Sequence, residues 1–321
     1  MTILVYGAGA VGLGVASFLA RAGARLLIVA RAPAAEPLRR GGLVRTGIFG
    51  EHRVLPSKLE VHTDAMGLPW GELDYVIVAT KSFDTAQVAH ELERSGAARS
   101  SARFVLFQNG WGNVETFSER LPPERVFAAR VITGFALSAP AEVRVTVHAE
   151  DIHIGSFDEG RERGVEPLAA AIAEGGIPCA TTPHIARDLW AKMLYNCALN
   201  SLGAVFEVSY GELATLPESR RIMDAVVTEV FGVMAASGYS THWSSPGEYL
   251  RLFYETLVPR TAAHESSTLQ DIRAGKRTEV EALNGAVVRL AERLDVPVPA
   301  NRLLLDMVRF KELRSRRAGR A

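Results

Sequence analysis

Short runs of apolar residues alternate with helical patterns through the first half of the chain. Residues 3–7 (ILVYG), 25–30 (RLLIVA) and 73–80 (LDYVIVAT) are almost continuously apolar, which is typical of strands buried on both faces. A helical pattern over residues 11–22 follows the first run and ends before Gly23, a residue type common just past a helix. This alternation predicts a parallel sheet covered by helices on both faces.

The strand-like pattern continues to about residue 154. Residues 103–108 (RFVLFQ) predict one more buried strand, which leads into a glycine-rich turn. Residues 125–133, 143–147 and 151–154 also have β-type patterns, and we expect them to pair as hairpins. The first half of the chain is therefore predicted to be of the α/β class.

The pattern changes near Pro183, after which apolar residues recur at helical spacing without strand-like alternation. The predicted helices cover residues 184–206, 219–236, 246–258, 278–294 and 301–313. Residues 175–178 (GGIP) interrupt the periodicity just before this half. The length of 321 residues suits about two domains. We expect these to be residues 1–175 and residues 176–321, the second of them all-helical.

Composition and charge exclude several classes of protein. The 36 Lys and Arg residues balance 36 Asp and Glu residues, without the basic excess typical of nucleic-acid binders. Cys179 and Cys197 cannot form a disulfide framework or a zinc site alone, which is typical of a reducing cytosol. Because the chain enters an apolar strand at once and has no apolar run of ~18 residues, we expect no signal peptide or membrane span. The expected location is cytoplasmic, with no metal, nucleic-acid or membrane partner.

A GxGxxG pattern follows the first predicted strand and opens the first predicted helix. Its residues are Gly7, Ala8, Gly9, Ala10, Val11 and Gly12. In this context Gly7 permits a tight turn, Gly9 lets the backbone approach a pyrophosphate, and Gly12 permits close packing of helix on strand. The helix N-terminus then offers free N–H groups to the anion. The motif predicts a dinucleotide site, and the alternative is a glycine turn without a ligand.

Arg31 lies at the end of the second predicted strand, 19 residues after Gly12, and no acid follows before Glu36. An NAD or FAD site usually places an acid here to hold the ribose 2′-hydroxyl. A guanidinium instead suits the 2′-phosphate of NADP, because it is a planar donor with a fixed charge. We therefore predict NADP(H) as the cofactor, the alternative being an exposed arginine without a ligand.

Two further loops follow predicted strands. Lys81 lies in TKSF, directly after the strand over residues 73–80, and Asn109 lies in QNGWGN, after the strand over residues 103–108. Ligands in open α/β sheets bind at the carboxyl ends of strands, so both residues are candidates for cofactor contacts. Asn109 and Gly110 also form a common turn pair, which is the alternative interpretation.

The helical half carries two concentrations of polar residues. Lys192, Asn196 and Asn200 are four residues apart on an otherwise apolar helix and therefore share one face. Burying such a stripe is costly unless it meets partners or a ligand, and an exposed helix face is the alternative. Residues 266–285 (SSTLQDIRAGKRTEVEALNG) form the second concentration and include Ser267 and Glu279. Helix capping and surface solvation are the alternative interpretation there.

These segments together resemble the ketopantoate reductase (2-dehydropantoate 2-reductase) family over nearly the whole chain. The resemblance is carried by GAGAVG, TK, QNG, WAKMLYNCALN and SSTLQDIRAGKRTEVEALNG. It implies an N-terminal Rossmann dinucleotide-binding domain and an all-helical C-terminal domain, with the active site between them. It also implies NADPH-dependent reduction of the 2-keto group of ketopantoate to D-pantoate, in pantothenate biosynthesis. The expected partner is a small 2-keto acid, with a homodimer as the candidate assembly.

The resemblance also implies roles for individual residues. Lys192 corresponds to the general acid that protonates the developing alkoxide, and Glu279 to a catalytic glutamate that orients Lys192 or the cofactor. The residues implied for substrate binding are Asn109, Asn196, Asn200 and Ser267, and Asn109 also contacts the cofactor. Arg31, Lys81 and the residues of the glycine-rich turn are implied as cofactor contacts.

Two positions depart from the family pattern. Tyr210 stands before GEL and His264 stands two residues before the serine pair, where the family pattern has asparagine. Losing a polar contact to a substrate hydroxyl can change specificity strongly. An NADP-dependent 2-hydroxyacid dehydrogenase for another branched or aromatic 2-keto acid is therefore the alternative activity. A non-catalytic alternative is a sensor protein that binds NADP but turns over no keto acid.

Overall fold

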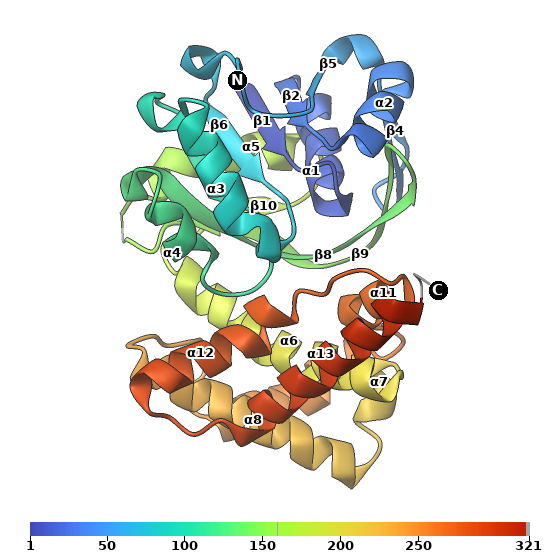
Figure 1. Cartoon of the computed structure of the whole chain (residues 1–321), viewed down its shortest axis with the longest axis vertical. Helices are drawn as coiled ribbons and strands as arrows, with labels where there is room; N and C mark the ends of the chain where they lie inside the picture. The colour runs from blue at the N-terminus through green and yellow to red at the C-terminus, as the bar shows by residue number, and fades with distance from the viewer. Residues whose placement is uncertain (159, 319–321) are drawn as a thin grey trace. The chain divides into compact units, whose positions relative to one another are not determined.

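The computed structural model describes residues 1–158 and 160–318 (Figure 1). The basic C-terminal tail is described only to residue 318, so its last three residues lie outside the described part. The chain divides into two compact units. Their bounds are Met1–Gln108 with Asn113–Ile185 for the first, and Asn109–Gly112 with Ala186–Ala321 for the second.

Within the described residues, the first unit holds a ten-stranded sheet ordered β4-β3-β9-β8-β7-β6-β1-β2-β5, with β10 paired to β9. Its strands are β1 (Thr2–Tyr6), β2 (Arg25–Val29), β3 (Leu43–Gly47), β4 (His52–Val54), β5 (Leu59–His62), β6 (Tyr75–Val78), β7 (Arg103–Leu106), β8 (Val126–Ala139), β9 (Glu142–Gly155) and β10 (Cys179–Thr181). The run from β7 to β5 is parallel, whereas β8 and β9 form an antiparallel hairpin. The carboxyl ends of β1, β2, β6 and β7 therefore meet at one edge.

Helices cover both faces of this sheet, as the continuous apolar runs predict. Alternate residues of β1 enter two separate cores: Ile3 and Val5 pack with α1 and α5, whereas Leu4 and Tyr6 pack with α3 and α4. The α-helices of this unit are α1 (Ala10–Arg21), α2 (Ala32–Gly41), α3 (Thr85–Arg94), α4 (Asn113–Ser118) and α5 (Glu166–Glu174). Its 3₁₀ turns are η1 (Pro56–Lys58), η2 (Trp70–Glu72), η3 (Ser82–Asp84), η4 (Ala97–Arg99), η5 (Pro123–Arg125) and η6 (Glu162–Val165).

The hairpin differs from the sequence-based expectation. The β-type stretches 143–147 and 151–154 are two parts of one 14-residue strand, β9, which pairs with the equally long β8. Register shifts interrupt the pairing between Arg130 and Thr133 and again further along. Most side chains over residues 147–151 are exposed, so this stretch lacks the apolar alternation from which a strand is recognised.

The second unit is helical throughout its described residues. Its helices are α6 (Ile185–Phe206), α7 (Tyr210–Leu213), α8 (Pro217–Ala236), α9 (Pro246–Leu252), α10 (Val258–Arg260), α11 (Ser267–Arg273), α12 (Asn284–Leu294) and α13 (Pro299–Ala318), with a π-helical turn η7 (Phe253–Leu257) and a 3₁₀ turn η8 (Val280–Ala282). The expected helix over residues 278–294 is therefore broken. At Leu283 the backbone has φ −101° and ψ −106°, outside the helical region, and α12 begins only after it.

A buried amide network joins four helices of the second unit. The fully buried Asn284 on α12 donates to the Cys197 carbonyl oxygen of α6 at 3.2 Å and to Asn301 Oδ1 of α13 at 3.0 Å. Asn301 in turn donates to the Glu229 carboxylate of α8 at 2.8 Å. Ser201 of α6 donates to Asn284 Oδ1. Because buried polar groups are stable only when paired, this network fixes the packing of α6 against α12 and α13.

Candidate functional site

Two glycines of the turn between β1 and α1 are required by the packing of the chain itself. Gly7 has φ +113°, and a Cβ there would lie 2.9 Å from the backbone of Ala79 and Thr80, just beyond β6. A Cβ on Gly12 would lie 2.0 Å from the Gly7 carbonyl oxygen. The turn therefore packs its backbone directly against the end of β6, and neither position accepts a larger residue without a shift of the main chain.

Gly9 differs, because the protein leaves the space beside it open. A Cβ on Gly9 would meet only the Ala79 carbonyl oxygen, at 3.8 Å, and the φ of −82° is one that any residue adopts. Gly9 precedes α1, whose N-terminus has no side-chain cap and no acidic residue in its first turn. Such a helix end presents unpaired N–H groups to an anion. The open position and the uncapped helix fit a dinucleotide pyrophosphate lying against the backbone.

Arg31 follows β2 at the same edge of the sheet and is exposed. The structure brings a carboxylate to it that sequence reasoning missed: Asp84 Oδ2, at the end of η3 after β6, lies 3.5 Å from Arg31 Nη2. The Arg31 side chain is 85% exposed and that of Asp84 29%. No short motif joins the two residues, since they are 53 positions apart in the sequence. Asp84 therefore places a negative charge beside Arg31, the residue predicted to bind the 2′-phosphate.

The loop that carries Lys81 is held by the side chain of Gln108. The Gln108 Nε2 donates to Thr80 Oγ1 at 3.2 Å, to the Lys81 carbonyl oxygen at 3.4 Å and to Thr85 Oγ1 at 2.9 Å. Gln108 itself is buried at the end of β7. The QNG segment therefore contains a second structural residue beside Asn109, one that fixes the neighbouring loop. The sequence pattern alone does not indicate this role of Gln108.

In the second unit, three predicted residues come together as a hydrogen-bonded chain. Lys192 Nζ on α6 donates to Asn109 Oδ1 at 2.7 Å. Asn109 Nδ2 donates to Glu279 Oε2 at 3.2 Å. Since both polar ends of the Asn109 amide are engaged, its orientation is set by an ammonium on one side and a carboxylate on the other.

Backbone contacts hold the Asn109 segment and Glu279 close together. The Trp111 N–H donates to the Ala282 carbonyl oxygen at 2.9 Å. Gly110 has φ +88°, and a Cβ there would lie 2.4 Å from the same carbonyl oxygen. Glu279 lies directly before η8 and is only 8% exposed. A side chain larger than hydrogen at position 110 would therefore push the Asn109 loop away from Glu279.

The polar stripe on α6 continues beyond Lys192. Asn196 is half-buried, and its side chain forms no hydrogen bond within the described part of the chain. Asn200 is 6% exposed, and its Oδ1 accepts a hydrogen bond from the Tyr210 hydroxyl. Ser267, the first residue of α11, is exposed, and its hydroxyl has no partner among the described residues. Asn196 and Ser267 are thus available to bind a ligand.

The two departures from the family pattern lie side by side. The Tyr210 and His264 rings are 5.2 Å apart, and the Tyr210 N–H donates to the His264 carbonyl oxygen at 3.0 Å. Tyr195 packs edge-on against Tyr210, with ring centroids 5.8 Å apart. Burial raises the pKa of Tyr210 above its ordinary value, so its hydroxyl stays protonated. Tyr210 therefore acts as a neutral donor that occupies the Asn200 acceptor.

The two cysteines have no reactive environment. Burial raises the pKa of Cys179 to about 12, with Asp151 as a smaller cause. The fully buried Cys197 also has its pKa raised by burial. Reactive cysteines need a lowered pKa and exposure. Both thiols are free: Cys197 is buried, and Cys179 is half-buried and packs against the core of the first unit. Among the described residues there is also no metal-binding group of three or more His, Cys, Asp or Glu, and no helix apolar and long enough to span a bilayer.

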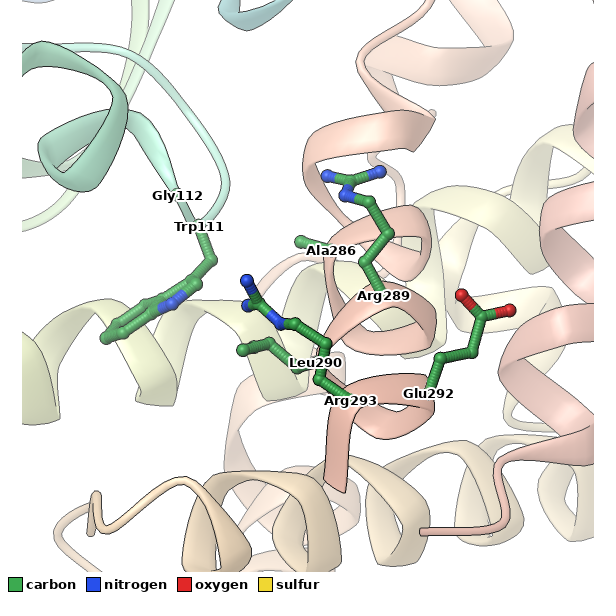
Figure 2. A pocket seen from close by; sticks show the side chains of 7 residues that line it. All are labelled: Trp111, Gly112, Ala286, Arg289, Leu290, Glu292 and Arg293. Atoms are coloured by element: carbon green, nitrogen blue, oxygen red, sulfur yellow. The ribbon is translucent and has the colours of Figure 1, made fainter. Parts of the chain in front are cut away.

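A small pocket of about 370 Å³ lies between Trp111 and α12 (Figure 2). Figure 2 shows the Arg293 guanidinium between the helix and the Trp111 ring. Trp111 is itself packed against Trp190 and Tyr239, with ring centroids 4.5 and 4.8 Å away. Of the predicted site residues none lines the pocket, so we assign it no part in the chemistry.

Comparison with protein families gives two matches that together span most of the chain. The model described as "Ketopantoate reductase PanE/ApbA" matches residues 3–159. The model described as "Ketopantoate reductase PanE/ApbA C terminal" matches residues 184–312. The two matched segments fall largely on the first and second compact units respectively.

Full-length relatives agree with these matches. The "2-dehydropantoate 2-reductase" of Aquifex aeolicus is 36% identical over 318 residues, which cover 98% of this chain and 97% of that protein. That of Halobacterium salinarum is 33% identical over 315 residues, covering 97% and 99%. The crystal structure of a PanE/ApbA family ketopantoate reductase from Ralstonia eutropha superposes with a TM-score of 0.84 at 31% identity, covering 98% and 99%. A D-mandelate dehydrogenase solved with NADH and anilino(oxo)acetate has a TM-score of 0.85 at 21% identity, with the same coverage, and shares the fold.

Proposed function

Because this chain belongs to the ketopantoate reductase family, we propose that it reduces the 2-keto group of ketopantoate to D-pantoate with NADPH, in pantothenate biosynthesis. The observation that supports the chemistry most directly is the chain of hydrogen bonds from Lys192 through Asn109 to Glu279. The expected rate-accelerating groups of a keto-acid reductase, a cationic proton donor and an anionic partner, are thus held in one network.

The dinucleotide is held by the first unit in this proposal. The turn from Gly7 to Gly12 receives the pyrophosphate, Arg31 receives the 2′-phosphate and Lys81 adds a cation at the end of β6. When bound, NADPH supplies the hydride for carbon 2 of the keto acid. We assign cofactor binding to residues 1–175 and substrate binding with catalysis to residues 176–321, except that Asn109 serves both.

Lys192 does the proton chemistry in this proposal. Its ammonium donates a hydrogen bond to the keto oxygen, stabilises the negative charge that develops there and then gives up a proton, so that a hydride and a proton add across the C=O bond. Asn109 Oδ1 accepts from the same ammonium and directs it. Glu279 Oε2 accepts a hydrogen bond from Asn109 Nδ2 and so fixes the Asn109 amide from the other side.

The substrate contacts come from the polar residues on α6 and α11. Asn196 and Ser267 have no protein partner among the described residues, and Asn200 keeps its Nδ2 donor while Tyr210 occupies its acceptor. These donors suit the carboxylate and hydroxyl oxygens of ketopantoate. A homodimer and a cytoplasmic location stay predictions from the sequence.

The test is NADPH oxidation by the purified protein with ketopantoate, followed by identification of the product. We expect one D-pantoate per NADPH consumed. The second candidate is reduction of another branched or aromatic 2-keto acid, which the ring cluster of Tyr195, Tyr210 and His264 beside Asn200 favours. Slow turnover of ketopantoate together with fast turnover of an aromatic 2-keto acid would favour that candidate.

A further inference from the structure

Arg31 and Asp84 bridge the place where the proposed dinucleotide must lie. In the sheet β1 has β2 on one side and β6 on the other. Arg31 follows β2 and Asp84 lies in the turn that follows β6, and their side chains are 3.5 Å apart. The ion pair therefore spans the carboxyl end of β1, from which the glycine-rich turn begins.

The two partners differ in how firmly they are held. Asp84 ends a 3₁₀ turn in which its N–H donates to the Lys81 carbonyl oxygen at 2.9 Å. The next residue, Thr85, is buried and bonded to Gln108 and to Asn113. Arg31 has only its backbone in the start of α2, and its side chain is almost fully exposed. The Asp84 carboxylate thus stands on a short side chain from an anchored turn, whereas the long and exposed Arg31 side chain is the member that can turn toward a ligand.

A carboxylate at this place has opposite effects on the binding affinities of NADPH and NADH. The 2′-phosphate of NADPH binds the Arg31 guanidinium only by displacing the Asp84 carboxylate from it. After displacement, the negative charge of Asp84 still lies near the phosphate and repels it. The ribose 2′-hydroxyl of NADH carries no charge and can donate a hydrogen bond to a carboxylate. Both effects reduce the advantage that Arg31 alone would give to NADPH.

We propose that Asp84 is a specificity-determining residue that reduces the ratio of NADPH affinity to NADH affinity, so that the protein binds both cofactors. This inference rests on the proposed dinucleotide site but not on the identity of the keto acid. It assigns to Arg31 the recognition of the 2′-phosphate, and to Asp84 both the restraint of Arg31 and the recognition of the 2′-hydroxyl.

The experiment is a titration of the free protein with NADPH and with NADH, followed by reduced-nicotinamide fluorescence without any keto acid. In Asp84→Asn we expect NADPH to bind about tenfold more tightly, because a like charge is removed, and NADH to bind several-fold more weakly. Glu36→Gln is the matched control, since Glu36 is an exposed acid of the same unit that pairs with Arg40. We expect the control to leave the ratio of the two dissociation constants unchanged.

The outcomes separate this inference from the proposed function. If the wild-type protein binds NADPH and Asp84→Asn leaves the ratio unchanged or weakens NADPH, Asp84 does not act as proposed, while the dinucleotide site stands. If the wild-type protein binds neither cofactor, both the site and the inference fail. In Arg31→Ala we expect NADPH binding to fall at least tenfold while NADH binding is retained, and an equal loss of both would also overturn the division of roles.

Discussion

The two units of this protein build their candidate sites in different ways. In the first, the shape comes from backbone: Gly12 packs on the Gly7 carbonyl oxygen, and Gly7 packs on the main chain of Ala79 and Thr80. In the second unit the site is formed by side chains that are distant in sequence and are brought together by folding, since Asn109 is 83 residues from Lys192 and 170 residues from Glu279. The glycines of the backbone site thus form one local sequence motif, whereas the residues of the side-chain site are brought together only by the packing of the unit. Single substitutions in each unit test this difference.

The largest effect is expected at Lys192. Replacing it by alanine removes the proton donor, which is typically worth ~10²–10⁴ in rate. We expect kcat to fall by roughly this amount, while NADPH binding stays within about twofold, because Lys192 has no cofactor contact in the proposed function. Steady-state kinetics and a fluorescence titration measure the two quantities. Lys276→Ala, an exposed lysine of the same unit, is the control and should behave as wild type. An unchanged kcat in Lys192→Ala would remove the lysine from the mechanism.

The next effect tests the backbone site. In Gly9→Ala the added methyl group meets no protein atom closer than 3.8 Å, so we expect the melting temperature to stay within about 2 °C. In the proposed dinucleotide site the same methyl group would lie in the path of the pyrophosphate, and we expect NADPH affinity to fall by roughly 10–100-fold. Gly71→Ala is the control, because that glycine also has open space and an ordinary φ. Retained NADPH affinity in Gly9→Ala would place the dinucleotide elsewhere.

A smaller effect is expected at the end of the hydrogen-bonded chain. Glu279→Gln keeps the size of the side chain but removes the charge that faces the Asn109 amide. We expect kcat to fall about tenfold, the cost of one charge-assisted hydrogen bond. Asn109→Ala and the double variant complete the cycle: because Glu279 acts through Asn109, the two losses should combine to less than their product. Strictly multiplicative losses would mean that the two residues act independently.

The smallest effect on the kinetics is expected at Tyr210, which contacts Asn200 on α6. Tyr210→Phe removes the hydroxyl that donates to Asn200 and leaves a buried acceptor unpaired, which costs on the order of 1 kcal/mol. With the Asn200 amide free to rotate, we expect KM for ketopantoate to rise several-fold and kcat to stay within about twofold. Tyr195→Phe is the control, since its hydroxyl bonds to Thr261 at 2.5 Å instead. Equal changes in both variants would indicate a general packing effect.

The sequence predicted those parts of the fold in which local pattern and final structure coincide. The strand, glycine turn and helix from residue 2 to residue 21 and the long helix α6 are of this kind. The short strands β3, β4 and β5 were not predicted. Each has only three to five residues, and their half-exposed side chains lack a continuous apolar run. The break at Leu283 was also missed, because apolar periodicity does not report backbone dihedral angles.

The candidate site shows the same limit. The residues Lys192, Glu279 and Asn109 were all singled out, but their hydrogen-bonded order was not, since it depends on tertiary packing. The carboxylate beside Arg31 is not predictable from the residues that follow β2, because Asp84 lies after β6. The sequence predicts that Tyr210 removes a polar contact to the substrate, which stays a prediction. The hydrogen bond from the Tyr210 hydroxyl to the Asn200 side chain depends on tertiary packing and is not predictable from the pattern.

The most direct test of the account compares kcat/KM for ketopantoate with that for a panel of branched and aromatic 2-keto acids, using the wild-type protein and NADPH. We expect ketopantoate to give the highest kcat/KM, with an advantage of at least tenfold over the analogue that lacks its hydroxyl group. A higher kcat/KM for an aromatic 2-keto acid would contradict ketopantoate as the substrate. An absence of turnover with every keto acid would contradict the reductase itself.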